Sequence, residues 1–242
     1  MNAKSQRLQL TLDSSQLEEA TSCLLNTVLL HRTVGKFTYK TEGNYSIGVI
    51  GTEDVDCVTI PDYTFLRVTS RDLECYLRPK VQEFSAVVKG SRADSGRLTL
   101  EFYQRKRRQW PLQDDVSAWE IWHLDFQLAN SKSEMDRSKL KEAAAENLAE
   151  LIFSICQAIN KPQYLPKVPV RDDIGLVFDT QFADVQPFLF RFAHEVPLFG
   201  HYGMGGQQQL SPHYNYHSSS PNANQTGLGS TVRKLIKDTL SF

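Results

Sequence analysis

Two alternating segments that flank a short polar stretch constrain the fold of this chain more than any other feature. The first segment places its apolar side chains at Leu98, Leu100 and Phe102. The second places them at Trp122, Leu124, Phe126 and Leu128. A period of two residues is typical of a β-strand with one buried face. The stretch between them, residues 105–115, is basic, polar and proline-containing, so we predict a long β-hairpin whose tip is exposed.

Other segments carry strand and helix patterns. Strand patterns cover residues 7–12, 35–51, 57–68 and 185–196, the last with Phe188, Phe190 and Phe192 on one face. Helices are predicted over residues 13–32, 70–90 and 132–160. Asp13 or Ser14 caps the first helix, and Pro79 is expected to kink or split the second. Strands mixed with helices predict a single α/β (α+β) domain.

The third predicted helix has one continuous apolar stripe. The stripe consists of Ala144, Leu148, Leu151, Ile152, Ile155 and Ile159. Charged residues lie largely off this stripe, which is the pattern of a helix with one face packed on a core.

The bulk composition is that of an ordinary globular protein. The chain has 242 residues and a net charge of −1, so no global field draws it to nucleic acid or to an acidic membrane. No apolar run reaches the ~20 residues of a membrane span, and the N-terminus lacks the apolar core of a signal peptide. The cysteines, which form no CxxC pair, are interpreted as reduced thiols; they are Cys23, Cys57, Cys75 and Cys156. We therefore predict a cytosolic protein, in which the glycosylation sequons at Asn44 and Asn224 are chance matches.

No motif of a familiar catalytic chemistry is present. The sequence has no GxSxG elbow, Walker loop, HExxH motif or kinase signature. His213 and His217 are four residues apart, but their segment has no helical pattern, so we predict no metal site there. His31 and His123 lie on predicted regular elements, which favours structural roles, and nothing local would activate a Cys–His pair. The prediction is a protein without enzymatic activity, cofactor or metal.

The hairpin tip combines a basic run, Arg105–Arg108, with Trp110. The run predicts either a solvated tip or a nucleic-acid contact, and the absence of interleaved aromatic residues favours the solvated tip. A tryptophan beside arginine has the composition of a protein–protein hot spot. The alternative is that Trp110 folds back onto the sheet, and composition leaves both interpretations open.

The last part of the chain has an unusual composition. Between Val196 and Val232 there is no Asp, Glu, Lys or Arg, and the segment is rich in Gly, Gln, Ser and Asn. This composition predicts a disordered insertion over residues 200–229. Residues 230–242 then place apolar side chains at helical spacing beside basic residues, which predicts an amphipathic helix. The helix either caps the core, which we favour, or detaches to dock on a partner or on lipid.

Several strings are more specific than fold patterns. They are Leu29-Leu-His-Arg-Thr-Val-Gly-Lys-Phe, Gly51-Thr-Glu-Asp-Val-Asp-Cys, Glu101-Phe-Tyr-Gln-Arg-Lys, Tyr164-Leu-Pro-Lys-Val-Pro, Phe178-Asp-Thr, Asp184-Val-Gln-Pro-Phe-Leu and Leu235-Ile-Lys-Asp-Thr-Leu. In these strings the chain resembles the autophagy-related protein 101 family, a family of small HORMA-domain proteins. The similarity runs from the N-terminus to about residue 196 and resumes near Ser230.

The resemblance implies a HORMA domain: a β-sheet with helices packed on one side and a C-terminal safety-belt-like segment that can rearrange. Residues 1–199 would form this domain, and residues 230–242 would complete it after the insertion. The resemblance also implies an adaptor of the autophagy-initiating kinase complex, in the cytoplasm and at the phagophore assembly site. There it would pair with and stabilise the HORMA domain of autophagy-related protein 13 and recruit downstream autophagy factors. No enzymatic activity comes with the family.

The family also has a protruding Trp-Phe finger used for recruitment. Its tryptophan matches Trp110, and Leu112 stands where the family has phenylalanine. Leucine can fill an apolar pocket, with less area and without a ring. The resemblance therefore implies Trp110, Pro111 and Leu112 as partner-binding residues. It implies neither nucleic-acid binding nor stable membrane insertion.

Two other functions stay open at this stage. A HORMA adaptor of the checkpoint type would wrap its C-terminal segment around a bound peptide, although the charge-free insertion would interrupt such a belt. A hydrolase or nucleic-acid binder with an unfamiliar site is the remaining alternative.

Overall fold

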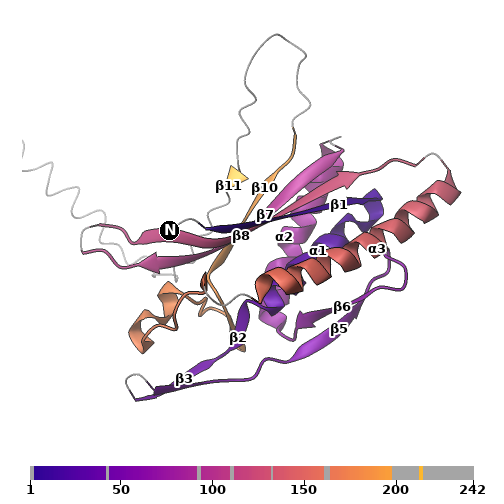
Figure 1. Cartoon of the computed structure of the whole chain (residues 1–242). Helices are drawn as coiled ribbons and strands as arrows, with labels where there is room; N and C mark the ends of the chain where they lie inside the picture. Colours follow the sequence, from indigo (N-terminus) through magenta and orange to yellow (C-terminus); the bar gives the residue numbers. More distant parts are fainter. Residues whose placement is uncertain are drawn as a thin grey trace, which may run out of the picture.

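A single five-stranded sheet forms the frame of the molecule. The structure is a computed structural model, and it describes residues 3–41, 44–91, 94–109, 112–131, 133–160, 164–197 and 213–214. The strand order is β1-β8-β7-β10-β11 (Figure 1). The strands are β1 (Lys4–Leu12), β7 (Ser95–Lys106), β8 (Asp115–Leu128), β10 (Phe190–Glu195) and β11 (His213–Tyr214). β1 is parallel to β8 and the other neighbours are antiparallel, so the predicted hairpin is confirmed as β7–β8.

Three helices accompany the sheet, close to the predicted positions. They are α1 (Leu17–Leu30), preceded by the short helix η1 (Ser14–Gln16), α2 (Arg71–Gly90) and α3 (Glu134–Ile159). Asp13, Ser70 and Ser133 each accept a backbone hydrogen bond from the turn that follows, which satisfies amides that the helix itself leaves unpaired. The predicted mixed α+β class is therefore confirmed.

Pro79 does not split α2, contrary to one of the two predicted effects. The helix continues through Pro79, which leaves the carbonyl of Cys75 without its usual intrahelical donor. Both residues are exposed to solvent. Water can therefore hydrate this carbonyl, and the buried face of the helix keeps its hydrogen bonds.

The core lies between the inner face of the sheet and the helices. Phe84 of α2 is fully buried, and its ring lies 5.7 Å from that of Phe126 on β8. Gly96 on β7 makes this close packing possible, because a Cβ atom there would lie 2.5 Å from a methyl carbon of Val88. The sheet thus needs a glycine where α2 crosses it.

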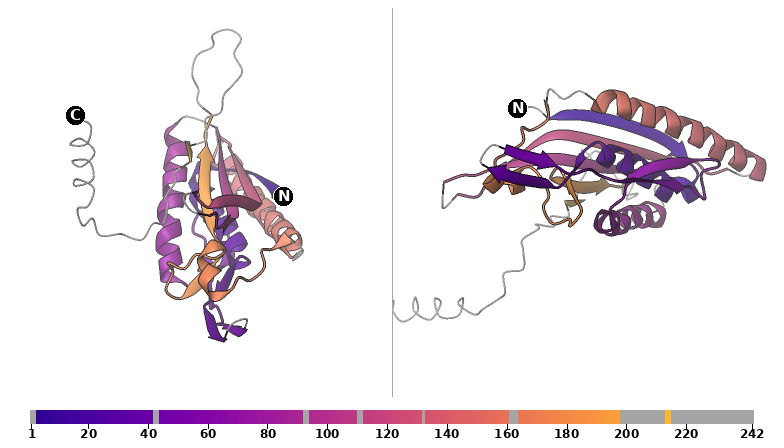
Figure 2. Two further views of the ribbon diagram at one scale, coloured as in Figure 1. Left: turned by 90° about the vertical axis from the view of Figure 1, so that its left-hand side faces the viewer. Right: turned by 90° about the horizontal axis from the view of Figure 1, so that it is seen from below.

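Shorter strand pairs extend the molecule away from the main sheet (Figure 2). They are β2 (Thr33–Gly35) with β9 (Val185–Pro187), β3 (Phe37–Thr41) with β4 (Asn44–Ile47), and β5 (Thr52–Asp56) with β6 (Thr64–Val68). The helix η3 (Arg171–Leu176) precedes β9. The predicted strand over residues 57–68 is too long, because the segment before Thr64 turns between β5 and β6.

The strand predicted over residues 185–196 is two strands that belong to different sheets. β9 pairs with β2, whereas β10 pairs with β7. At the change-over the amide of Phe188 donates to the carbonyl of Arg32, and the carbonyl of Leu189 accepts from Tyr103. Phe188, Phe190 and Phe192 are all buried, so a single apolar pattern was consistent with a chain that changes its partner.

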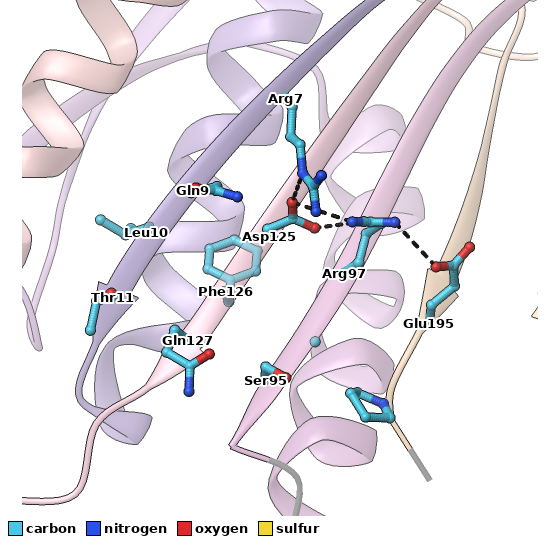
Figure 3. A pocket seen from close by; sticks show the side chains of 12 residues that line it. Arg7, Gln9, Leu10, Thr11, Ser95, Arg97, Asp125, Phe126, Gln127 and Glu195 are labelled. Carbon is cyan, nitrogen blue, oxygen red and sulfur yellow. Dashed lines mark hydrogen bonds and ion pairs between the residues drawn. The ribbon is translucent and has the colours of Figure 1, made fainter. Parts of the chain in front are cut away.

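The outer face of the sheet carries a row of charges that crosses four strands (Figure 3). Asp125 lies between Arg7 and Arg97, and Arg97 also reaches Glu195, with 3.4 Å between nitrogen and oxygen. These side chains line a groove of about 410 Å³. Their charges are balanced within the row, so the face is polar without a net field.

Most of the predicted C-terminal features lie outside the described residues. Within the predicted insertion, residues 200–229, the structure describes only His213 and Tyr214, which pair with His194 and Ala193 of β10. The predicted helix over residues 230–242 is entirely outside the described part. The domain boundaries therefore stay predictions.

Asp13 links the start of α1 to α3 through an ion pair. Its carboxylate accepts from Ser15 and from Arg137, whose Nε lies 2.9 Å away. Burial on its own raises the pKa of Asp13, but the hydrogen bonds from Arg137 and Ser15 outweigh it and lower the pKa from 3.8 to about 2.

We predict that Asp13→Asn removes part of the acid sensitivity of folding. The folded-state pKa is below the unfolded value, so the stabilisation is complete above about pH 4 and is lost as the pH falls through about 2. Over this pH range the free energy of unfolding of the wild type should fall by up to about 2 kcal/mol more than that of the variant. Urea denaturation at pH values from 5 to 2 measures the free energy of unfolding of each protein. Asp54→Asn, at an exposed position, is the control. Parallel pH profiles for the wild type and Asp13→Asn would contradict the prediction.

Candidate functional site

The predicted partner-binding residues belong to the tip of the β7–β8 hairpin. The hairpin extends beyond the body of the sheet (Figure 1). Leu112 is 62% exposed, and its amide donates to the carbonyl of Gln109 at 3.1 Å. Trp110 and Pro111 lie outside the described residues. Leu112 therefore lies at the surface, away from the core.

The basic run of the tip is engaged in intramolecular contacts. Arg107 donates to the backbone carbonyl of Asp172 at 2.7 Å and pairs with the carboxylate of Asp173 at 3.1 Å, both in η3. Arg108 pairs with Asp115 across the base of the tip at 3.4 Å. Exposed pairs of this kind each contribute only about 0.2–1 kcal/mol, so their effect is mainly to orient the tip. These contacts weaken the nucleic-acid interpretation of the run.

The helix η3 and the β3–β4 hairpin lie at the same end of the molecule as the tip (Figure 2). Tyr39 on β3 donates its hydroxyl to the carbonyl of Pro169, just before η3, at 3.0 Å. Arg107 makes the corresponding link between η3 and the tip. One end of the molecule is therefore tied together by contacts between segments far apart in the sequence.

A β-bulge interrupts the hairpin between its body and its tip. Phe102 pairs with Glu120, but the next residue, Tyr103, pairs with Ala118. Trp119 is therefore the extra residue on β8, and it is buried together with its neighbour Glu120. Normal strand alternation would have sent one of these two side chains to the outer face.

Beside the bulge, Glu120 lies in a fully buried polar cluster. Its carboxylate oxygens accept from Nε and Nη2 of Arg32 at 2.6 and 2.9 Å, and both residues are excluded from solvent. Arg32 also donates to the hydroxyl of Tyr164 at 2.9 Å and to the carbonyl of Ile159 at 3.2 Å. The cluster joins the end of α1, the bulge of β8 and the end of α3.

Tyr164 completes this cluster as both donor and acceptor. Its hydroxyl donates to Glu120 at 3.0 Å and accepts from Lys4 at 3.1 Å. Burial, together with the neighbouring charge of Glu120, raises the pKa of Tyr164 to about 12, so the hydroxyl keeps its proton at neutral pH. The side chains that surround Glu120 thus stabilise its charge without opening it to substrate.

The sequence offered a signal for this cluster that the predictions did not use. Glu120 lies in the same alternating register as Trp122 and Leu124, which places a charge on the buried face of the strand. A charged residue at such a position needs an opposite charge inside the protein. The partner, Arg32, lies just after α1 and could not be identified from spacing.

The outer side of α3 exposes two large apolar side chains. Of the predicted stripe, Ala144, Leu148, Ile155 and Ile159 are buried, while Leu151 and Ile152 are partly buried. Met135 and Phe153 lie off this stripe and are 69% and 64% exposed. These two side chains are apolar area that the described part of the chain leaves exposed.

The one histidine–cysteine contact among the described residues has little catalytic character. Nε2 of His31 lies 3.8 Å from Sγ of Cys156. Burial and the adjacent charge of Arg32 lower the pKa of His31, which favours the neutral ring. In the described part of the chain no carboxylate hydrogen-bonds this ring to orient it, as nucleophilic catalysis requires.

Other titratable residues take part in local structure. Burial raises the pKa of Cys57 to about 11 and also raises that of Cys23, so both stay thiols at neutral pH. Nδ1 of His123 lies 3.0 Å from the hydroxyl of Thr99 on the neighbouring strand. Among the described side chains, no three His, Cys, Asp or Glu gather to hold a metal ion. No described helix has the length and apolar character to cross a bilayer.

The fold and this set of contacts define a class: an α+β protein with a projecting two-stranded arm anchored by a buried ion pair. Residues 9–172 match the family model described as Autophagy-related protein 101. The chain is 38% identical to Autophagy-related protein 101 of Homo sapiens and 36% identical to that of Xenopus tropicalis, each over the full length of both chains. It is 22% identical to that of Arabidopsis thaliana, over 69% of this chain and 80% of the relative. The chain therefore belongs to the autophagy-related protein 101 family, whose members are autophagy-related proteins.

We predict that removing one partner of the buried ion pair destabilises the protein more than removing both. Glu120→Gln leaves Arg32 buried without its counter-charge, which should cost about 3–5 kcal/mol. The double variant Arg32→Met/Glu120→Leu leaves no such charge and should be more stable than Glu120→Gln. Chemical denaturation followed by circular dichroism measures both. A double variant at least as unstable as Glu120→Gln would show that packing, and not charge, dominates here.

Proposed function

We propose that this chain is a non-catalytic HORMA-domain adaptor of the autophagy-initiating kinase complex. In this proposal it heterodimerises with the HORMA domain of autophagy-related protein 13, stabilises it, and recruits downstream autophagy factors in the cytoplasm at the phagophore assembly site. The observation that carries the proposal is the exposed hairpin tip, which ionic contacts orient and a buried cluster anchors. Membership of the family supports the autophagy role.

The recruiting surface in this proposal consists of Trp110, Pro111 and Leu112. The exposure of Leu112 supports it, because a side chain at 62% exposure is available to enter an apolar pocket of a partner. The contacts of Arg107 and Arg108 also support it, since a pre-oriented loop loses less conformational entropy on binding. Neither of these two observations requires a catalytic residue in the tip.

The heterodimer surface in this proposal is the outer side of α3 together with the free edge of β1. Phe153 supplies the large apolar side chain that an interface core needs. β1 is an edge strand of the described sheet, and no described strand pairs with its other side, so that side is available to a partner. The two elements pack against each other, which makes the surface continuous.

Trp110→Ala should leave folding and heterodimerisation unchanged and weaken recruitment. Truncation of a hot-spot tryptophan typically costs about 2 kcal/mol or more, which corresponds to a loss of binding of about 30-fold. The melting temperature, the mass of the heterodimer and the proteins that co-purify with it are the three measurements. Gln113→Ala, in the same exposed tip, is the matched control and should bind as the wild type does.

Two results would count against the recruiting tip. A clearly lowered melting temperature for Trp110→Ala would assign Trp110 to the core. Unchanged recruitment together with unchanged stability would assign recruitment to another surface. The substitution Leu112→Phe, which adds apolar area at an exposed position, should strengthen recruitment.

Co-expression with the HORMA domain of autophagy-related protein 13 should give a one-to-one heterodimer by light scattering. Phe153→Ala should weaken it at least about tenfold, because truncation of a buried aromatic anchor costs more than about 1.4 kcal/mol. Val49→Ala, which truncates an exposed apolar side chain between β4 and β5, away from α3, is the control. Two separate folded monomers would overturn the adaptor proposal itself, whereas equal effects of both substitutions would relocate the interface.

A further inference from the structure

The exposed side of α3 has a regular arrangement of apolar and acidic residues. Met135 and Phe153 are 18 positions apart, which is five turns of an α-helix, so they lie on one line along its surface. Glu142, Glu146 and Glu150 lie between them on the same side, at helical spacing. The whole face is exposed to solvent. Lys139 also lies on this side, but the three glutamates outnumber it, so the face combines an apolar anchor with net negative charge.

Little within the described part of the chain neutralises or covers this face. Glu146 and Glu150 form no ion pair with any described residue, and Glu142 only accepts a weak hydrogen bond from Ser138 at 3.3 Å. The alanines at 143 and 149 are exposed beside them, which would allow another helix to approach closely. A face of this kind favours a basic, amphipathic helix as its occupant.

The chain itself contains a segment with the complementary pattern. Residues 230–242 carry apolar side chains at Val232, Leu235, Ile236 and Leu240. Arg233, Lys234 and Lys237 accompany them, in the first cationic stretch after Val196. As a helix this segment would be about 20 Å long, and the stretch of α3 from Glu142 to Phe153 is about 17 Å long. The two patterns thus agree in length and are opposite in charge.

The segment is also within reach of α3. β11 ends at Tyr214 on the edge of the sheet opposite β1, and α3 packs beside β1. The sheet has four strand intervals, about 19 Å in all at ~4.8 Å each. The 15 residues from 215 to 229 can span up to about 50 Å when extended. The connection is therefore long enough to pass around the sheet.

We propose that residues 230–242 dock as an amphipathic helix on the outer side of α3. In this arrangement the apolar side of the segment covers Phe153, and its cations lie along the acidic row of Glu142, Glu146 and Glu150. The C-terminus then shields Phe153, which is 64% exposed in the described chain. If the heterodimer surface proposed above is correct, the partner must displace this segment, so the C-terminus regulates pairing.

Hydrogen–deuterium exchange on the full-length chain tests the docking without the partner. Residues 230–242 should exchange at least about tenfold more slowly than an unstructured peptide of the same sequence. The double reversal Glu146→Lys/Glu150→Lys should abolish this protection. Adding Arg233→Glu/Lys234→Glu/Lys237→Glu to it should restore protection, because the charges are then opposite again. Asp54→Lys/Asp114→Lys changes the net charge equally at exposed sites away from α3 and should have no effect.

Each other outcome overturns the proposal. Exchange at the unstructured rate in the wild type shows that the segment does not dock on its own chain. Protection that persists in Glu146→Lys/Glu150→Lys places the segment elsewhere, for example as a cap on the core. Protection that requires anionic phosphatidylserine vesicles identifies a lipid surface as its partner.

The same measurement separates this proposal from the proposed function. Adding the HORMA domain of autophagy-related protein 13 should release residues 230–242 and protect α3 instead. A protected C-terminus in a chain that forms no heterodimer leaves the docking intact and overturns the adaptor function. A heterodimer that leaves the C-terminus fully protected retains the adaptor function and overturns the regulation of pairing by this segment.

Discussion

The buried ion pair between Arg32 and Glu120 is the interaction on which the arrangement of the other elements depends. Two charges that are excluded from water are tolerated only when their hydrogen bonds are satisfied in detail. Here that condition requires the end of α1, the bulge of β8, the end of α3 and Tyr164 to be in place together. The pair therefore makes the assembly of these segments interdependent, even if its net contribution to stability is small.

The aromatic residues around the pair extend this interdependence to the second half of the chain. The ring of Trp119 lies 5.5 Å from that of Phe102 and 5.1 Å from that of Phe188. Phe188 is the residue at which the chain passes from β9 to β10. The segment that connects β9 to β10 therefore packs against the base of the hairpin. Because the base is closely packed, weak surface ion pairs are sufficient to orient the tip.

Periodicity predicted most of the regular structure, because most elements bury one face. The hairpin, α2 and the stripe of α3 follow from alternation or helical spacing in single segments. The change of sheet at Phe188 could not be predicted from periodicity, because a strand that exchanges one partner for another keeps the same buried side chains. The bulge at Trp119 could not be predicted either, because it depends on the pairing with the partner strand and not on the local sequence. The pair of Arg32 and Glu120 joins residues 88 positions apart, and no spacing rule reaches that far.

The candidate site was predicted from the sequence to a more limited extent. The projecting tip follows from the hairpin pattern, and the exposure of Leu112 agrees with it. The contacts of the basic run could not be predicted from the sequence, because the acceptors of Arg107 lie in η3, about 65 residues away. The exposed side of α3 was implicit in its stripe, but Phe153 could be placed outside the core only once the packed residues were known.

The bulge at Trp119 also sets the direction in which the tip faces. Strand side chains alternate with a period of two, so one extra residue puts the outer part of β8 half a period out of step with the inner part. The direction in which the tip faces therefore depends on whether the number of residues between Glu120 and the turn is odd or even. It does not depend on which residues form the tip. Tip residues can be exchanged without changing this orientation, whereas the loss or gain of one residue in the strand reverses it. Length changes in this arm are compatible with a conserved orientation only when they come in pairs.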